Sequence, residues 1–397
     1  MNNPLKYSGL ISATATLLIG CGGDNNPTDT GINRDTDLAI IQTVAADYSG
    51  SSVQVVDLLE SDLVTTDEYL ALDLSDYDIA THQGSLYHIG RYNIDELTQA
   101  DIDKDLSETY TYSLLDDPED NSANVYRMVF ISDSKAYLIR YGQPNIWIVN
   151  PSATTENDFK LGELDLSEYL DQDTSVEASD GIIVDGKLFV AMQRIDSTTG
   201  NPLTNSAYVA VFDTATDTEI DTDLTDDPNN LYGIELSIHN TNNFAYHEDA
   251  GLLLGGAGDP WGAAYYGRDP GFEGGIVQID TVSYVETMLV DDGDDIDHPY
   301  GYFQKIAIID EENGFFVGLA AYQDTSLFHF NPSTGDVTAV SGIENIEIGA
   351  LTASPSDNVW VGVYDAADPR ILVVNTDLET EAEIKTAQNP KTIIFTD

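Results

Sequence analysis

The sequence predicts an all-β protein, a seven-bladed β-propeller closed by pairing of the C-terminal strand with the N-terminal blade. Three observations predict it. Almost no helical periodicity is present after Leu38, and short runs of β-branched and aromatic residues alternate with Asp, Asn, Gly and Pro. A four-strand unit recurs about every 51 residues, which is close to the usual propeller period. The two ends of the chain each carry an incomplete unit.

The repeat is clearest in the middle of the chain. A turn such as Asp185-Gly186 joins the first two strands of a unit, in the manner of a β-hairpin. Later copies contain Phe244, Ile306 and Ala350, and a weaker copy contains Ile79. The two best units have their strands at 128–133, 135–140, 145–150 and 159–164, and at 181–185, 187–192, 208–213 and 218–221.

The two chain ends complete one blade. Residues 391–397 resemble the first strand of a unit without a successor, and Leu38–Ile41 resemble a second strand without a predecessor. Pairing them gives a blade made of the C-terminal strand and of 38–44, 53–57 and 64–70, and it removes an exposed sheet edge. A two-sheet sandwich, the alternative for many short strands, does not explain the divided repeat. The units loosely resemble the YVTN-type bacterial propeller repeats over 38–397, by pattern and not by a diagnostic motif.

The N-terminal residues resemble a bacterial lipoprotein signal. Lys6 precedes an apolar stretch that ends Leu18-Ile19-Gly20-Cys21, like a lipobox. The resemblance implies a signal peptide at 1–20, lipidation of Cys21, a flexible tether at 21–37 and the propeller at 38–397. No Asp follows Cys21, which favours an outer-membrane lipoprotein of the cell envelope, facing the periplasm or the surface. The alternative is an ordinary signal peptide with an incidental cysteine.

Composition excludes several classes of protein. The chain has 15 basic and 70 acidic residues, a net charge of −55, which argues against a nucleic-acid-binding protein. The 42% hydrophobic residues and 37 aromatic residues can form a large core. A single cysteine allows no intramolecular disulfide and no site built from several thiolates. We expect a monomer.

Motif searches predict no catalytic residue. The sequence has no Gly-x-Ser-x-Gly elbow, no His-Glu-x-x-His pair and no phosphate-binding Gly-x-x-x-x-Gly-Lys loop. The six histidines are spread over several blades without metal-ligand spacing, so structural roles are expected ahead of a metal site.

Arginine and aromatic residues recur where second strands end, and this placement predicts a ligand-binding face. Lys305 and Lys391 begin first strands on the same face of a propeller. Guanidinium groups and aromatic rings suit a flat anionic or electron-rich ligand. The alternative is that these arginines form ion pairs between blades. The predicted ligand-binding residues are Arg91, Tyr92, Arg127, Arg140, Tyr141, Arg194, Trp261, Arg268, Tyr322 and Tyr364.

An acidic segment between the fifth and sixth units offers oxygen ligands for calcium. It contains Asp291, Asp292, Asp294, Asp295 and Asp297. The segment 101–105 also alternates aspartates but lacks the glycine and glutamate of an EF-hand. The alternative is solvated loop charge.

Two classes of function follow. The favoured one is a lipid-anchored binding protein that captures a small anionic or aromatic ligand, such as an iron chelate or nutrient, alone or for an outer-membrane transporter. Replacing Arg140 by alanine is then expected to weaken capture and leave the fold intact. The alternatives are a calcium-dependent lactonase-like hydrolase and a protein-interaction scaffold without catalysis. Convergence of Arg91, Arg140 and Arg194 on one pocket would favour binding.

Overall fold

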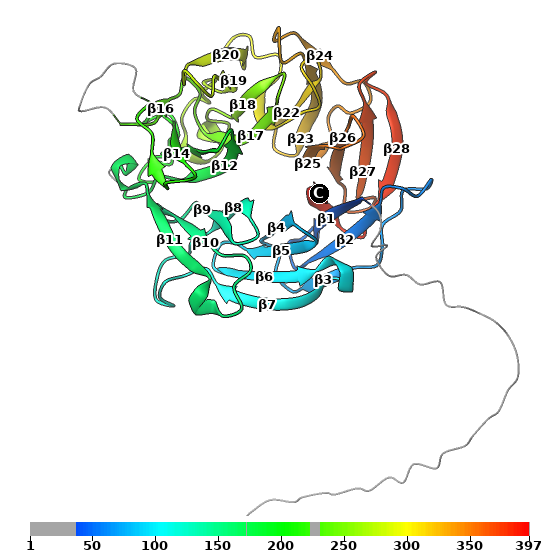
Figure 1. Cartoon of the computed structure of the whole chain (residues 1–397). Coiled ribbons are helices and arrows are strands. Elements are labelled where there is room, and N and C mark those ends of the chain that lie inside the picture. Colours follow the sequence, from blue (N-terminus) through cyan, green and yellow to red (C-terminus); the bar gives the residue numbers. More distant parts are fainter. Residues whose placement is uncertain (1–36, 172, 223–230, 397) are drawn as a thin grey trace, which may run out of the picture. The chain divides into compact units, whose positions relative to one another are not determined.

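The computed structural model describes residues 37–171, 173–222 and 231–396, which form seven antiparallel sheets around a common axis (Figure 1). The lipobox, Cys21 and the tether up to residue 36 lie outside the described residues. No helix in the described part has the length and apolar character needed to cross a membrane.

The blades are numbered from the one that holds the first strand, and their strands run from the axis outward. The first blade consists of β29 (Asn389–Phe395), β1 (Leu38–Val44), β2 (Ser51–Asp57) and β3 (Tyr69–Leu72). The second consists of β4 (Tyr77–His82), β5 (Ser85–Gly90), β6 (Glu96–Asp101) and β7 (Ser107–Ser113). The third consists of β8 (Val125–Ser132), β9 (Lys135–Arg140), β10 (Asn145–Val149) and β11 (Lys160–Asp165). The fourth blade consists of β12 (Ala178–Val184), β13 (Lys187–Met192), β14 (Tyr208–Asp213) and β15 (Thr218–Glu219), and β16 (Ile234–Glu235) also pairs with β14. The fifth consists of β17 (Thr241–His247), β18 (Gly251–Gly256), β19 (Gly275–Ile279) and β20 (Glu286–Asp291). The sixth blade consists of β21 (Tyr302–Ile308), β22 (Gly314–Ala321), β23 (Asp324–Phe330) and β24 (Val337–Ala339). The seventh consists of β25 (Glu347–Ala353), β26 (Asn358–Tyr364), β27 (Arg370–Asn375) and β28 (Thr380–Lys385).

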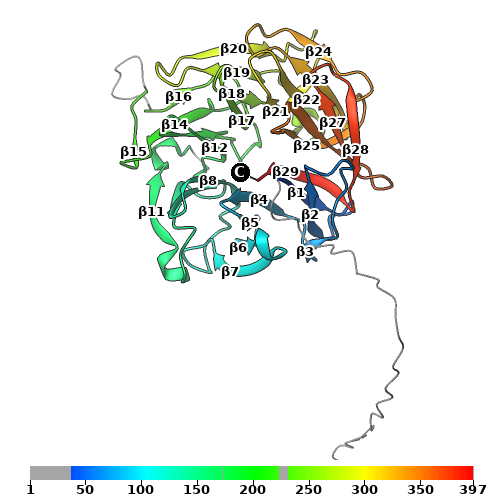
Figure 2. The ribbon, with the colours of Figure 1, turned by 45° about the vertical axis from the view of Figure 1, so that its right-hand side comes forward.

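The predicted closure is confirmed. β29 pairs antiparallel with β1, so the last strand of the chain is the innermost strand of the first blade, near the axis (Figure 2). Ile394 lies opposite Ile40 in this ladder, and Leu38 N donates to Thr396 Oγ1 at 3.0 Å. The outermost strand of this blade was expected at 64–70 and lies instead at Tyr69–Leu72, with Thr65 forming only an isolated bridge to Val56.

The hydrophobic core lies between neighbouring blades. Second strands are buried on both faces, which explains their continuous apolar runs. Tyr137 and Ile139 of β9, for example, pack with Leu188 and Val190 of β13 in one cluster. Neighbouring sheets thus cover each other's apolar faces.

A bulge recurs near the start of the innermost strands. In six of the seven blades, the pairing of the innermost strand with its neighbour slips at this point. Only β4 pairs with its neighbour without a slip. The inserted residues are Lys391, Tyr126, Ser179, Asn242 or Asn243, Gln304 and Gly349. A bulge bends a strand and re-aims its side chains, so this end of the axis acquires a distinct lining.

Candidate functional site: the axial channel

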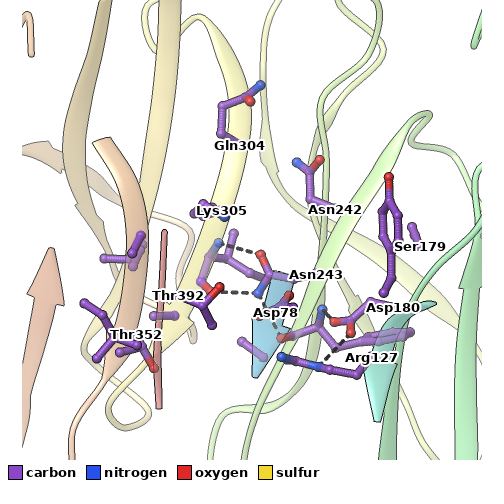
Figure 3. A pocket seen from close by; sticks show the side chains of 18 of the residues that line it. Asp78, Arg127, Ser179, Asp180, Asn242, Asn243, Gln304, Lys305, Thr352 and Thr392 are labelled. Atoms are coloured by element: carbon purple, nitrogen blue, oxygen red, sulfur yellow. Dashed lines mark hydrogen bonds and ion pairs between the residues drawn. The ribbon is translucent and has the colours of Figure 1, made fainter. Parts of the chain in front are cut away.

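A cavity of about 520 Å³ follows the propeller axis and is lined by residues of the innermost strands. Lys391, Tyr126, Ser179 and Gln304, all inserted at bulges, are part of its lining. Figure 3 shows polar side chains from several blades converging on it. The bulges therefore place polar groups where an unbroken inner strand would continue its apolar pattern.

Charge is concentrated in this channel. Four of the 15 Lys and Arg residues line it, together with two carboxylates. Around the axis, starting at the first blade, the inner strands contribute Lys391, Asp78, Arg127, Asp180, Asn243, Lys305 and Ala350, and the β5–β6 turn adds Arg91. The lining is net positive in a protein of net charge −55, so the channel is a local positive site within a protein whose overall field repels anions.

Arg127 and Asp180 neutralise each other. Arg127 Nε lies 3.1 Å from Asp180 Oδ1, and the backbone N–H of Phe244 donates to Asp180 Oδ2 at 2.8 Å. The Asp180 carboxylate raises the pKa of Arg127, and burial raises the pKa of Asp180 against the opposing effect of Arg127. This pair connects the third and fourth blades and contacts the fifth.

The charge of Lys391 is also balanced by a carboxylate. Its Nζ lies 3.1 Å from Asp76 Oδ1 and donates to Tyr77 O at 2.7 Å. Burial lowers the pKa of Lys391, and the carboxylates of Asp78 and Asp76 oppose this effect.

Lys305 has no such partner. Within the described residues its ammonium makes no hydrogen bond and no ion pair, and its neighbours around the axis are Asn243 and Ala350. Asn243 instead uses its amide on the β21 backbone, donating to Ile306 O at 2.9 Å and accepting from Ile306 N at 3.1 Å. Burial is the main cause that lowers the pKa of Lys305; Lys391, Arg91 and Arg127 lower it further, and Asp78 opposes them. Lys305 is thus an available donor in the channel (Figure 3).

At one end of the channel, the guanidinium group of Arg91 and two tyrosine rings form a stack. Arg91 Cζ lies 4.0 Å from the centroid of the Tyr126 ring, which stacks on Tyr141 at 4.4 Å. Tyr141 Oη donates to Gln193 Oε1 at 2.9 Å, and Gln193 Nε2 donates to Thr241 O at 2.7 Å. This chain of contacts joins the second to the fifth blade. Arg91 Nε is buried without a hydrogen-bond partner in the described structure, 3.7 Å from Asp76 Oδ1.

Three of the predicted site residues lie at or beside the channel, namely Arg91, Arg127 and Tyr141. Two others, Arg140 and Arg194, do not line it. Arg140 is 2% exposed; it donates to Asn145 Oδ1 and to Leu114 O, and its Cζ lies 4.5 Å from the Trp147 ring centroid. Burial lowers its pKa to about 10. Arg194 donates to Tyr169 O at 2.9 Å and to Ser206 O at 3.1 Å. Both guanidinium groups hold the backbone of their own neighbourhood, so the expected convergence of Arg91, Arg140 and Arg194 is not observed.

Three more predicted residues gather around the fifth blade. Arg268 binds Asp259 Oδ2 at 2.6 Å and the carbonyls of Thr199 and Gly200. Trp261 lies edge-on to the exposed ring of Tyr322, with centroids 6.4 Å apart. The structure does not place these residues in the channel lining.

The last two predicted residues are separate from each other. Tyr92 is 61% exposed, and its backbone N–H contacts Asp76 Oδ2 at 3.3 Å. The ring of Tyr364 lies against Gly349, where a Cβ would come within 1.8 Å of it. Neither lines the channel.

The predicted calcium segment is not assembled as a metal site. Among the described residues, no three His, Cys, Asp or Glu side chains form a group that can hold a metal ion. Asp292 is buried with Oδ2 accepting from Gly274 N at 3.0 Å, whereas Asp291, Asp294, Asp295 and Asp297 are exposed. The Asp294 carboxylate accepts from the backbone of Ile296 and Asp297, so it closes the loop on itself.

The histidines have partners close by in the structure. His88 is buried, its Nε2 lies 2.9 Å from Gln42 Oε1, and burial lowers its pKa to about 4. His82 contacts Asp133 and stacks on Phe130. None of the six lines the channel cavity.

The polar channel residues that the sequence did not indicate include Asp78, Asp180, Asn243 and Gln304. They share one signal, a polar residue directly before or at the start of the apolar run of a first strand. In a propeller this position faces the axis, so a polar residue there is the sequence signal of a channel lining.

Comparison with known proteins gives the fold. No protein-family model and no curated protein matches the chain. A protein from Lactobacillus plantarum is similar in structure with a TM-score of 0.60 and 12% identity, over 91% of this chain and 99% of that one. A candidate 6-phosphogluconolactonase from Bacteroides uniformis has a TM-score of 0.58 and 10% identity, over 91% and 100%. A quinonprotein alcohol dehydrogenase-like protein from Bacteroides thetaiotaomicron has a TM-score of 0.50 and 11% identity, over 91% of each chain. At these identities the likeness shows the propeller fold alone.

Proposed function

We propose that this protein binds a small organic anion in the axial channel, and that it does so as a lipid-anchored protein of the cell envelope. The ligand class is an anion of a few charges, such as a phosphate ester or a polycarboxylate. The lipid anchor rests on the lipobox resemblance that ends at Cys21.

The observation that carries the proposal is the ammonium of Lys305. It stands in the channel without a hydrogen bond or ion pair in the described structure, near three other cations. Removing a cation from water without a partner costs free energy, and a bound anion offsets that cost. Arg91 adds a guanidinium that suits carboxylate or phosphate oxygens.

The cavity volume agrees with this ligand class. About 520 Å³ falls within the range of small-molecule sites, and the lining provides amides and hydroxyls of Asn242, Gln304 and Thr392 for the neutral part of a ligand.

The test is isothermal titration calorimetry of the purified protein with citrate, 6-phosphogluconate and inorganic phosphate. We expect saturable binding of an organic anion and about a tenfold loss of affinity in Lys305→Met, since a charge-assisted hydrogen bond is lost. Lys104→Met is the matched control, because Lys104 is exposed and pairs with Asp101, and neither residue lines the channel. Equal affinity in the wild type and Lys305→Met would overturn the proposal.

A second candidate, lactone hydrolysis in the same channel, is suggested by the likeness to candidate 6-phosphogluconolactonases. A phosphorylated lactone would use the same cations, and Asp78 is the channel carboxylate available as a base. Its test is hydrolysis of 6-phosphogluconolactone above the spontaneous rate, lost in Asp78→Asn.

A further inference from the structure

A second cavity of about 610 Å³ lies between the fifth and sixth blades and shares no lining residue with the channel. The connection between β18 and β19 and the connection between β20 and β21 form one side of it. Strands β21, β22 and β23 of the sixth blade form the other side. We call it the aromatic cleft, after Phe272, His298, Tyr300, Tyr302 and Phe328 in its lining.

The walls of the aromatic cleft are held rigidly by ring contacts. Phe272 stacks between His298 and Tyr302, with centroid distances of 4.2 and 4.7 Å. Tyr300 lies edge-on to Phe328 at 5.5 Å. His298 Nδ1 lies 2.9 Å from Asp294 O, which fixes the loop that carries it. Such a wall is formed before any ligand arrives, which reduces the entropy lost on binding.

Two glycines allow this arrangement. A Cβ on Gly318 would come within 2.1 Å of Tyr300 O and 2.8 Å of the Phe328 ring. Gly301 has a φ of 64°, and its Cβ would come within 2.3 Å of Leu319 O. A side chain at Gly318 would displace Tyr300 and Phe328, and one at Gly301 would clash with the β22 backbone at Leu319, so both glycines are needed to keep the wall in place.

The charge at this cleft is negative, opposite to that of the channel. Asp269 and Asp295 line it, both are exposed, and neither makes a side-chain hydrogen bond or ion pair within the described structure. No Lys or Arg is part of the lining. Arg268 is adjacent in sequence to Asp269 but directs its guanidinium to Asp259 Oδ2.

We propose that the aromatic cleft binds a small organic cation, an ammonium or quaternary ammonium group on an apolar body. Both faces of Phe272 are covered in its stack, so the rings that attract a cation within about 6 Å through their quadrupoles are the other aromatic residues of the lining. The carboxylates of Asp269 and Asp295 add direct attraction, and the net charge of −55 draws cations towards the surface. An anion is disfavoured by all three effects, and a neutral ligand gains from none of the charges.

The probe is choline, measured by isothermal titration calorimetry against the full protein. Its neutral isostere, 3,3-dimethylbutan-1-ol, has the same shape without the charge and serves as the ligand control. Glucose serves as the probe for a neutral saccharide. We expect saturable binding of choline, about tenfold weaker binding of the isostere, and weaker choline binding as NaCl is added.

Variants identify the site. Asp295→Asn and Asp269→Asn are each expected to weaken choline about threefold, as for an exposed charge pair. Asp297→Asn is the matched control, since it removes the same charge from the same loop outside the lining. Phe272→Leu, checked for folding by its melting temperature, should weaken choline binding because the stack that positions His298 and Tyr302 is lost. Lys305→Met should leave choline affinity unchanged, which separates this site from the channel.

Four results would overturn the proposal. They are absence of saturable choline binding, equal affinity for 3,3-dimethylbutan-1-ol, binding of glucose in preference to choline, and an equal loss in Asp297→Asn. The last would show a diffuse effect of net charge and not a site.

Discussion

Arg127 Nε lies 3.1 Å from Asp180 Oδ1, so an ion pair inside the axial channel joins the innermost strands of the third and fourth blades. The Asp180 carboxylate is 4% exposed and also accepts from the backbone of the fifth blade at Phe244. A buried carboxylate with this many contacts depends on its cationic partner.

Arg127→Met is therefore expected to destabilise the protein. Removing the guanidinium leaves the buried Asp180 carboxylate without its counter-ion. Because the Arg127 side chain is 42% exposed and partly screened by solvent, the cost in the free energy of unfolding is about 2 kcal/mol. Urea denaturation at pH 7 measures this value. The double variant Arg127→Met, Asp180→Leu should recover part of the loss, and an unchanged midpoint in Arg127→Met would show that the pair contributes nothing.

Lys305→Met should have the opposite effect on stability. Its ammonium has no carboxylate partner in the described structure and lies near three other cations, so its removal relieves desolvation and repulsion. We expect the free energy of unfolding without ligand to rise by about 1 kcal/mol, as is common where a functional group is placed at a cost to the fold. The same variant loses anion affinity. A loss of both stability and affinity would mark Lys305 as structural.

Anion binding should take up protons at alkaline pH. The pKa of Lys305 is below its usual value because of burial and neighbouring cations, so part of the population is neutral at a pH where an exposed lysine is charged. A bound anion favours the charged form and raises this pKa. Affinity should therefore fall as the pH rises through the lowered pKa. Calorimetry at pH 9 in two buffers of different ionisation enthalpy measures the uptake, which Lys305→Met should lack.

The sequence predicted the second strands most accurately. Lys135–Arg140 and Lys187–Met192 were placed correctly because both faces of these strands are buried and their apolar runs are continuous. First strands begin about three residues earlier than expected, since their opening residues, such as Ser179 and Asp180, are polar and bulged. Those residues line the channel, so the local pattern failed where the polar lining of the candidate site interrupts the apolar run.

The candidate site was predictable only in part. Position within the repeat placed Arg127, Lys305 and Lys391 on one face, and the structure brings them into one cavity. The same reasoning could not tell Arg91 from Arg140, because both end second strands. Arg91 is turned towards the axis, whereas Arg140 is covered by Trp147 within its own blade. That difference depends on packing between distant residues and leaves no local signal.

The variant Arg140→Ala tests whether Arg140 stabilises the fold or contacts a ligand. Arg140 is fully buried and holds Asn145 and the carbonyl of Leu114, so we expect a loss of about 3 kcal/mol in the free energy of unfolding. This differs from the sequence-based expectation that the fold would be unaffected. Anion affinity of the folded fraction should be unchanged, because Arg140 is absent from the channel lining. Reduced affinity with unchanged stability would instead make Arg140 a ligand contact.

The buried carboxyl of Asp292 is expected to make the free energy of unfolding depend on pH. Burial raises its pKa to about 7, and its Oδ1 is buried without a hydrogen-bond partner in the described structure. Between about pH 7 and pH 4 the folded protein holds a proton on Asp292 that the unfolded chain has released, so this group adds stability as the pH falls.

Above pH 7 the ionised Asp292 costs free energy, because its charge is buried. Asp292→Asn keeps an oxygen that can accept from Gly274 N and removes that charge, so stability at pH 8 should rise by about 2 kcal/mol. Urea unfolding at pH 5 and pH 8 measures the difference between wild type and variant. The gain should be large at pH 8 and small at pH 5, where the wild-type carboxyl is already neutral. Equal effects at both pH values would show that this carboxyl does not titrate near neutrality. Asp297→Asn, which alters an exposed carboxylate of the same segment that does not contribute to the raised pKa of Asp292, should change neither value.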